Sequence, residues 1–172
     1  MWERVANSNL LSAVGIVRVT RSNARVLENV APDVFDEPID ASRLATYLRS
    51  PEHLMVVGVF EDRVVGQAAG VVHRHPDKHT DLFVDEVGVT PDFRKRGLAT
   101  ELLRKLFAIG KAKGCEEAWV LTELDNVAAR RLYGSAEGRA REIVMYEYDL
   151  SGARRLRNIR RNPGRLLVDL QP

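Results

Sequence analysis

The chain has 172 residues, 45% hydrophobic and 29% charged, so it is long enough for one well-buried core and too short for two typical domains. Its single cysteine, Cys115, excludes an internal disulfide and a multi-cysteine zinc site, and suits a reducing compartment. We interpret Cys115 as a small packing residue, with a catalytic thiol as the alternative. No apolar run reaches the ~18 residues that span a bilayer and no signal peptide is evident, so we expect a cytoplasmic protein.

The net charge of +2 is unevenly distributed along the chain. Residues 151–172 contain six arginines and one aspartate, a charge of +5, which leaves −3 for residues 1–150. We therefore expect a domain over residues 1–150, with its core over about 14–150, and an Arg-rich extension over residues 151–172. Most charge runs are solvated surface, and no aromatic residues lie between these arginines, so we expect no nucleic-acid binding.

Hydrophobic periodicity predicts one α/β (α+β) domain with a mixed sheet. Trp119 is expected in its core, and Asp40 or Ser42 as a helix cap. In chain order we expect first a strand over 14–20 and two helices within 21–50, separated by an acidic loop. Strands over about 54–60 and 64–73, joined by a turn at 61–63, and a strand over 81–89 follow. The rest of the chain is predicted to form a helix from Gly97 that ends by Gly114, a strand over 118–123, a helix from Asn126 to about Ala136, and a closing strand over 142–150.

The segment from Val87 to Thr100, VGVTPDFRKRGLAT, is the most informative part of the sequence. An apolar strand leads through a Thr-Pro turn and three basic residues into the helix that begins near Gly97. The first turn of a helix offers unpaired backbone N–H groups and the positive end of the helix dipole, which suit a pyrophosphate. Gly97 and Ala99 let the backbone approach such a ligand closely, and Arg94 to Arg96 add positive charge.

A second motif, NVAARRLY, runs from Asn126 to Tyr133. Asn126 stands at a helix start, where its amide can cap the helix or bond a ligand. Ala129 is small enough for a ligand to lie against the helix, and Tyr133 is about two turns beyond Asn126, on the same side. The alternative is that Asn126 is a plain cap and Tyr133 a half-buried core aromatic.

The two motifs, Val-x-Val-x-Pro with Arg-x-x-Gly-x-Ala and Asn-x-x-Ala-x-x-Leu-Tyr, resemble the cofactor signatures of the GNAT superfamily of N-acetyltransferases. The resemblance covers about residues 14–150. It implies a mostly antiparallel central sheet flanked by helices, with a cofactor cleft between splayed strands, and acetyl-CoA as cosubstrate without a metal. It also implies cofactor contacts from Val87, Gly88, Val89, Arg94, Lys95, Arg96, Gly97, Leu98, Ala99, Thr100, Asn126, Ala129 and Tyr133.

Within the superfamily the chain most resembles the type I aminoglycoside 3-N-acetyltransferases. That likeness is carried by DVFDEP, YLRSPEHLMVVGVFEDRVVGQAAGVV, FVDEVGV and the closing VMYEYDL. The sequence departs from the superfamily after Tyr133, where GSAEGRAREIV stands in place of the usual Gly-Phe. This departure falls in the loop on the acceptor side.

The resemblance assigns the acetyl-transfer chemistry to Glu86 and Tyr133. An amine must lose its proton before it attacks a thioester, and the superfamily has an acidic general base where Glu86 stands, acting directly or through water. Asp85 points to the opposite face of the strand, whereas Glu86 shares the face of Gly88. The alternative is that Glu86 is a structural acid paired with an arginine.

Tyr133 is expected to protonate the departing CoA thiolate. The resemblance implies that a backbone N–H group within Val87 to Val89 stabilises the tetrahedral oxyanion. No residue suggests a covalent acetyl-enzyme, so we expect direct transfer.

The acceptor is expected to be a small cationic amine, of aminoglycoside or polyamine type, because acidic residues concentrate in the loop that borders the acceptor entrance in this fold. A solvated loop that contains a helix cap is the alternative. Two rival functions remain: acetylation of a protein amine or aminoacyl-tRNA gripped by the Arg-rich extension, and a non-catalytic CoA-binding or assembly module. The acidic residues are Asp33, Asp36, Glu37 and Asp40.

The segment HRHPDKHTD places three histidines and two aspartates within nine residues, from His73 to Asp81. Pro76 begins a turn before His79, so we interpret the segment as a polar hairpin tip and expect no metal site. We expect a homodimer and no membrane association.

Overall fold

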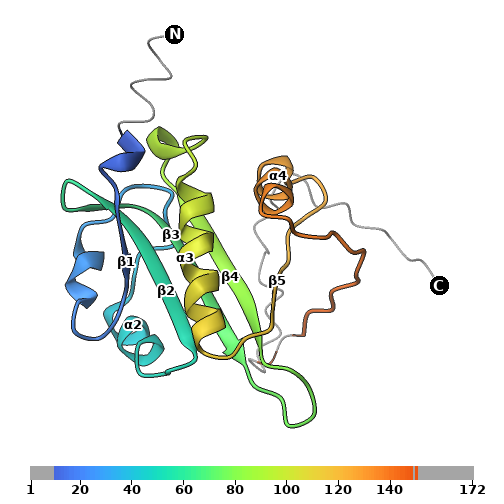
Figure 1. The fold of residues 1–172 in the computed structure, drawn as a ribbon. Coiled ribbons are helices and arrows are strands. Elements are labelled where there is room, and N and C mark those ends of the chain that lie inside the picture. The colour runs from blue at the N-terminus through green and yellow to red at the C-terminus, as the bar shows by residue number, and fades with distance from the viewer. Residues whose placement is uncertain (1–9, 149, 151–172) are drawn as a thin grey trace. The chain divides into compact units, whose positions relative to one another are not determined.

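Within the described residues, 10–148 and 150, five strands form one open sheet in the order β1-β2-β3-β4-β5 in the computed structural model (Figure 1). β1 to β4 pair antiparallel in sequence, and β5 runs parallel to β4. This mixed, mostly antiparallel sheet confirms the predicted fold class. The strands are β1 (Gly15–Arg18), β2 (His53–Phe60), β3 (Arg63–His73), β4 (Asp81–Val89) and β5 (Glu117–Val120).

β2 and β3 form the centre of the sheet, and most of their residues are buried. Their sequences are runs of valine, alanine and glycine, which fit a strand covered on both faces. The two strands are joined at Glu61 and Asp62, whose φ angles are 47° and 58°. Two consecutive positive φ values are typical of the tight hairpin turn that matches the strand twist, so the turn lies where the sequence predicts it.

The helix α3 (Leu98–Ala112) packs across one face of β2, β3 and β4 (Figure 1). Its leucines at helical spacing are almost fully buried, and each contributes roughly 1.5–3 kcal/mol by leaving water. This packing fixes the start of α3 beside the end of β4. The leucines are Leu98, Leu102, Leu103 and Leu106.

The segment before β2 covers the other face of the sheet. The first helix predicted there is only a short 3₁₀-helix, η1 (Ala24–Glu28), and the second is α2 (Ala41–Tyr47). Between them the chain is tied to β3, because Val64 donates to the carbonyl of Asn29 and accepts from Ala31 N–H. The buried cluster on this face consists of Val19, Leu27, Ala31, Val34, Met55, Val57, Val64 and Ala69, against which Leu44, Tyr47 and Leu48 of the α2 region pack.

The ladder between β3 and β4 changes register midway. Ala69 pairs with Glu86 but Gly70 pairs with Val84, so Asp85 is an extra residue in β4. Such a β-bulge reverses the alternation of side chains beyond it. Without the bulge Glu86 would lie on the face of Val84, the α3 side. With it, Glu86 lies on the face covered by the segment before β2.

The last strand of the sheet is shorter than predicted. β5 ends at Val120 instead of residue 123 and pairs only with Asp81–Val84, so within the described residues the second half of β4 has no β5 partner. The sheet is therefore open beside Asp85–Val89, as the splayed strands of the expected fold require. The prediction that Trp119 is a core residue is wrong: it lies on this edge strand and is 41% exposed, because an edge strand has a neighbour on one side only.

The chain forms two compact units, Met1–Leu121 with the sheet and Thr122–Pro172. In the second, α4 (Val127–Ser135) confirms the predicted helix. The predicted strand over 142–150 is wrong: residues 142–148 pair with no strand among the described residues, so the alternating sequence has no ladder to join. Its large apolar side chains are exposed, namely Ile143, Val144, Met145, Tyr146, Tyr148 and Leu150.

The Arg-rich extension lies outside the described residues. Among those residues, no helix combines the length and apolarity needed to cross a membrane.

A substitution at Gly88 tests how closely the segment before β2 packs on the sheet. A Cβ atom added there would stand 2.1 Å from the carbonyl oxygen of Val34. We expect Gly88→Ala to lower the free energy of unfolding by about 1–3 kcal/mol or more, because backbone must move. At Gly15 the nearest atom to an added Cβ is 4.0 Å away, so Gly15→Ala is the matched control. Equal denaturation midpoints for the two variants would contradict this packing.

Candidate active site

Glu86 is held at the point where β4, the bulge and the segment before β2 meet. It is partly buried, whereas the bulged Asp85 is exposed. The backbone N–H of Asp36 donates a hydrogen bond to the Glu86 carboxylate, and the side-chain amide of Gln67 in β3 acts on it as well. The carboxylate is thus anchored on one side by backbone and approached on the other by a neighbouring strand.

The surroundings of Glu86 make it a better proton acceptor than an exposed glutamate. Burial raises its pKa, and the negative charges of Asp36 and Asp85 raise the pKa further. The Asp36 N–H and the Gln67 amide oppose this rise, because donors close to the carboxylate favour its ionised form. A carboxylate with a raised pKa near a strand end that opens the sheet is the chemistry that general-base catalysis needs.

Tyr47 of α2 lies on the same side of the sheet. Its hydroxyl donates to the carbonyl of Leu54 at 2.8 Å, and its ring stacks on His53 with centroids 4.5 Å apart. Burial raises the pKa of Tyr47, and the charges of Asp85 and Glu86 add to the rise. Tyr47 is therefore a neutral, fixed wall beside the carboxylate rather than a proton carrier.

The loop between β4 and α3 contains two residues with a left-handed backbone. Lys95 has a φ of 58° and Gly97 a φ of 89°, both in the left-handed region. Arg94 folds back: its Nε donates to the Val89 carbonyl at 2.8 Å, and its guanidinium lies 3.5 Å from the Asp33 carboxylate. Arg96 donates to the carbonyl of Asp92 at 2.8 Å.

The side chains of this loop differ in what they offer a ligand. Leu98 is 1% exposed and belongs to the core, so only its backbone can face a ligand. Gly97 is exposed, and an added Cβ would meet nothing closer than Leu11 at 3.5 Å. Ala99 and Thr100 are partly buried.

The three residues expected to meet the cofactor from β4 are divided between the two faces of the strand. Val87 and Val89 pair with Ala68 and Gly66, whereas Gly88 pairs with Gln67 on the face of Glu86. Gly88 has a packing reason of its own, because Val34 passes directly over it.

The acidic loop does not act as one cluster. Asp33 pairs with Arg94 of the cofactor loop, and Asp36 lies next to Glu86. Asp40 is the N-cap of α2: its carboxylate accepts from Arg43 N–H and the Ser42 hydroxyl, each at 2.8 Å, and these bonds lower its pKa. This answers the sequence alternative in favour of Asp40 as the cap. Glu37 is exposed.

In the second unit, the Asn126 side chain accepts from Ala129 N–H at 3.1 Å. Its side-chain oxygen is therefore the N-cap of α4. Tyr133 is partly buried, and burial raises its pKa, which keeps the phenol protonated. Its carbonyl accepts from Gly138 N–H at 2.9 Å, so the segment after α4 turns back on the helix.

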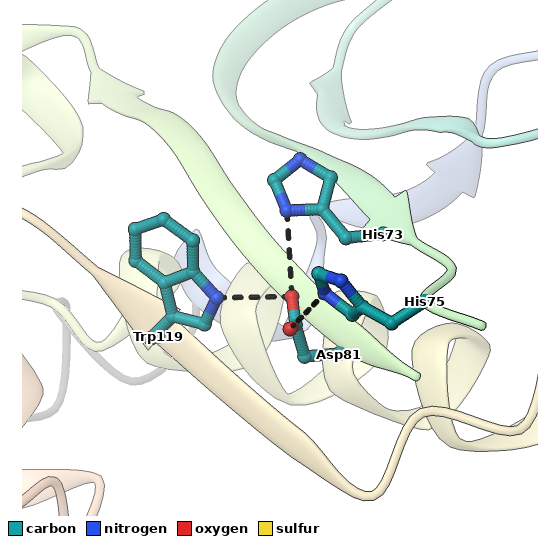
Figure 2. Close-up of polar contacts among 4 residues, drawn as sticks. All are labelled: His73, His75, Asp81 and Trp119. Atoms are coloured by element: carbon teal, nitrogen blue, oxygen red, sulfur yellow. Dashed lines mark hydrogen bonds and ion pairs between the residues drawn. The ribbon is translucent and has the colours of Figure 1, made fainter. Parts of the chain in front are cut away.

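The histidine-rich hairpin tip forms a separate polar cluster, shown in Figure 2. The Asp81 carboxylate accepts from Trp119 Nε1 at 3.0 Å, and lies 3.5 Å from His73 and 3.2 Å from His75. Burial raises the pKa of Asp81, but these partners more than offset it and lower the pKa. Within the part of the chain that is described, no three histidine, cysteine or acidic side chains are grouped to hold a metal ion.

Cys115 follows α3 and is partly buried. Burial raises the pKa of its thiol. A raised pKa disfavours the thiolate, which supports the packing interpretation over a catalytic one.

Sequence reasoning missed Gln67 and Tyr47 as neighbours of Glu86. Gln67 had a signal, because a single amide stands in the otherwise apolar run VVGQAAGVV. Tyr47 had none, since it matched the apolar face of a helix. The pair between Asp33 and Arg94 joins two loops about 60 residues apart in sequence, a separation that no local pattern spans.

Comparison with known proteins adds the family. Residues 22–137 match the model of the Acetyltransferase (GNAT) family, about two thirds of the chain. This chain belongs to the GNAT acetyltransferase family. It is accordingly an acetyl-CoA-dependent N-acetyltransferase, as the two motifs predict. The sequence matches none of the curated proteins.

Solved structures share the fold at low sequence identity. An aminoglycoside acetyltransferase from an uncultured soil metagenomic sample, in complex with trehalose, has a TM-score of 0.68 at 17% identity, over 80% of this chain and 96% of that one. AAC(6')-Iy, in complex with the bisubstrate analogue CoA-S-monomethyl-acetylneamine, has 0.67 at 19%, over 79% and 97%. Glucosamine-6-phosphate N-acetyltransferase from Arabidopsis thaliana has 0.62 at 18%, over 78% and 97%.

Proposed function

We propose that this GNAT protein moves the acetyl group of acetyl-CoA directly to a primary amine of a small cationic acceptor. The observation that carries the proposal is Glu86, a partly buried carboxylate with a raised pKa, beneath an acidic loop and on the strand that leads into the cofactor loop. A base is needed there because an amine attacks a thioester only in its neutral form.

The pyrophosphate of CoA is proposed to bind the backbone from Arg94 to Thr100. Lys95 and Gly97 have left-handed φ angles of 58° and 89° just before α3, and the first turn of a helix offers unpaired backbone N–H groups, which favour an anion. Lys95, Arg96 and Arg94 supply positive charge. The open edge of Val87–Val89 is available to the pantetheine arm and to the carbonyl oxygen of the acetyl group. Asn126 and Ala129 at the start of α4 are proposed to complete the cofactor contacts.

The proposed reaction proceeds in two steps without a covalent enzyme intermediate. Glu86, directly or through water, takes a proton from the ammonium, and the neutral nitrogen attacks the thioester carbon. Backbone N–H groups at Val87–Val89 stabilise the oxyanion. The carbon–sulfur bond then breaks, and Tyr133 donates its proton to the leaving thiolate. The nitrogen gives up its remaining extra proton, which restores Tyr133, and Glu86 releases its proton to solvent, so that CoA and the N-acetylated acceptor are formed. Burial, which keeps Tyr133 protonated, suits this role.

The acceptor class is inferred from charge. Asp36 is exposed and lies close to Glu86, and Glu37 follows it in the same exposed loop, so the loop would attract a polycation. Asp33 pairs with Arg94, and Asp40 caps α2. Two of the structurally similar proteins are named as acetyltransferases of aminoglycosides, which are polyamines of this kind. Acetylation at a 3-amino position stays a prediction from sequence resemblance.

Two glycines at opposite ends of α3 test the cofactor site. Gly97 and Gly114 both have a φ of 89°, and neither has an atom within 3.4 Å of an added Cβ. We expect Gly97→Ala and Gly114→Ala to lose similar stability, about 1–2 kcal/mol, from the same backbone strain. Only Gly97→Ala should weaken CoA binding, by about tenfold or more in calorimetric titration, a loss of about 1.4 kcal/mol. Equal CoA affinities in the two folded variants would remove the proposed pyrophosphate site.

The chemical roles are tested by pH–rate profiles with acetyl-CoA and a polyamine or aminoglycoside. Glu86→Gln should depress kcat/KM most at low pH, where the amine is protonated, and less as pH rises. Tyr133→Phe should slow turnover and leave CoA affinity nearly unchanged. Each change is expected to cost about 10²- to 10⁴-fold.

Asp85→Asn is the matched control for Glu86. Asp85 is the exposed neighbour whose charge raises the Glu86 pKa. Its neutralisation should keep the maximal kcat/KM and move the acidic limb, the fall of kcat/KM toward low pH, slightly to lower pH. Wild-type profiles for both Glu86→Gln and Tyr133→Phe would show that the chemistry belongs to other residues.

The acceptor class is tested by neutralising the loop. Asp36→Asn with Glu37→Gln should raise the acceptor KM, leave CoA affinity unchanged, and lose its effect as salt is added, because exposed charges are screened beyond about 8 Å at physiological ionic strength. The exposed pair Asp77 and Lys78 on the hairpin tip offers a control, Asp77→Asn. A preference for neutral or anionic amines in a thiol-release screen would defeat this acceptor assignment and leave the acetyltransferase activity intact.

A further inference from the structure

Gln67 is an anomaly in the core of the sheet. It is 0% exposed, and apart from Thr90 it is the one buried polar side chain among the described residues. Neither its amide nitrogen nor its amide oxygen has a hydrogen-bond partner that satisfies normal geometry. A buried amide without partners destabilises the folded state, and an apolar side chain of the same shape would avoid this cost. Packing therefore does not explain why a glutamine, rather than an apolar residue, occupies position 67.

The register of the sheet gives Gln67 one polar neighbour of consequence. Gln67 pairs with Gly88 and Ala69 pairs with Glu86, so Gln67 and Glu86 are diagonal neighbours on the same face. Long side chains at diagonal positions of adjacent strands are within reach of each other. Gly88, the residue directly opposite Gln67, has no side chain to stand between them. This alignment exists only because the bulge at Asp85 turns Glu86 to this face.

We propose that Gln67 is a positioning residue for acetyl transfer, whose buried amide nitrogen donates to the carboxylate of Glu86 and fixes the direction of this base. The proposal rests on the proposed role of Glu86 as the base. With the Asp36 N–H on one side and the Gln67 amide on the other, the carboxylate is held between two donors. One lone pair remains directed toward the incoming amine or its bridging water.

The electrostatics of the site support this role. The groups that face Glu86 are Asp36 from the loop before α2, Asp85 from its own strand, and Tyr47 from α2. The two carboxylates raise the pKa of Glu86, Tyr47 is neutral, and the Gln67 amide lowers the pKa. Gln67 thus limits a rise that would otherwise keep the base protonated, and therefore inactive, over a wider range of pH.

The test is the near-isosteric Gln67→Met variant, which removes both amide atoms and keeps the volume. Because a donor to the ionised form is lost, the Glu86 pKa should rise by about one pH unit in a carbon-13 NMR titration of the carboxyl group. The acidic limb of kcat/KM should move to higher pH by the same amount. Acetyl-CoA affinity and the thermal midpoint should not fall.

Val57→Ala is the matched structural control. Val57 pairs with Gln67 from β2, is 0% exposed, and belongs to the same core cluster. It should lower stability by leaving a cavity, and leave the Glu86 titration and the acidic limb in place. A shift of the limb in Val57→Ala equal to that in Gln67→Met would reduce Gln67 to a packing role and overturn the proposal.

The outcomes separate this inference from the proposed function. If Glu86→Gln leaves the acidic limb in place, Glu86 is not the base and both ideas fail. If Glu86→Gln moves the acidic limb of kcat/KM toward the pKa of the free amine, but Gln67→Met moves neither the limb nor the NMR titration, Glu86 stands as the base and the role of Gln67 fails. The double variant, which combines Gln67→Met with Glu86→Gln, should have the same pH profile of kcat/KM as Glu86→Gln alone.

Discussion

A single extra residue in β4 determines the surroundings of Glu86. Beyond the bulge at Asp85 every side chain of the strand changes face, so Glu86 leaves the α3 side of the sheet and joins the side lined by Gln67 and Ala69. On the α3 side it would have met a layer of fully buried leucines, where an ionised carboxylate has no compensating donor. On the other side it meets a backbone N–H and an amide. The bulge therefore gives Glu86 a partly buried site with nearby donors, which suits its proposed role as the base.

The segment before β2 provides the surroundings of the Glu86 carboxylate. It is tied to β3 through Val64 and passes over Gly88 so closely that only glycine fits beneath it. This places Asp36 where its N–H reaches Glu86 while its side chain stays in solvent. One residue thus stabilises the carboxylate through its backbone and raises the pKa through its charge. These opposite effects keep the base ionisable while raising its proton affinity.

The sequence predicted the parts of the molecule that depend on local patterns. The strands between His53 and Val89, the hairpin turn, and the leucine stripe of α3 all follow from periodicity and turn chemistry, and the motifs of the cofactor loop and of α4 led to the correct family. What failed depends on partners far away in sequence. A strand over 142–150 needs a ladder, and the burial of Trp119 needs a second neighbouring strand. The choice of Glu86 over Asp85 assumed strict alternation along the strand. The bulge breaks this alternation between Val84 and Glu86 but leaves Glu86 and Gly88 on the same face.

The ion pair between Asp33 and Arg94 joins the two halves of the proposed site in the first unit. Asp33 belongs to the acidic loop beside the base, and Arg94 to the loop proposed for the pyrophosphate. Both side chains are largely exposed, so the pair itself adds little stability. The pair matters for charge. An anion bound at the proposed phosphate site would compete with Asp33 for the positive charge of Arg94, and Asp33 would then be less neutralised. Occupation of the cofactor loop would in this way make the acidic loop more negative toward a cationic acceptor. Through this one contact, the proposed binding of the pyrophosphate would change the charge that the acidic loop presents to the acceptor.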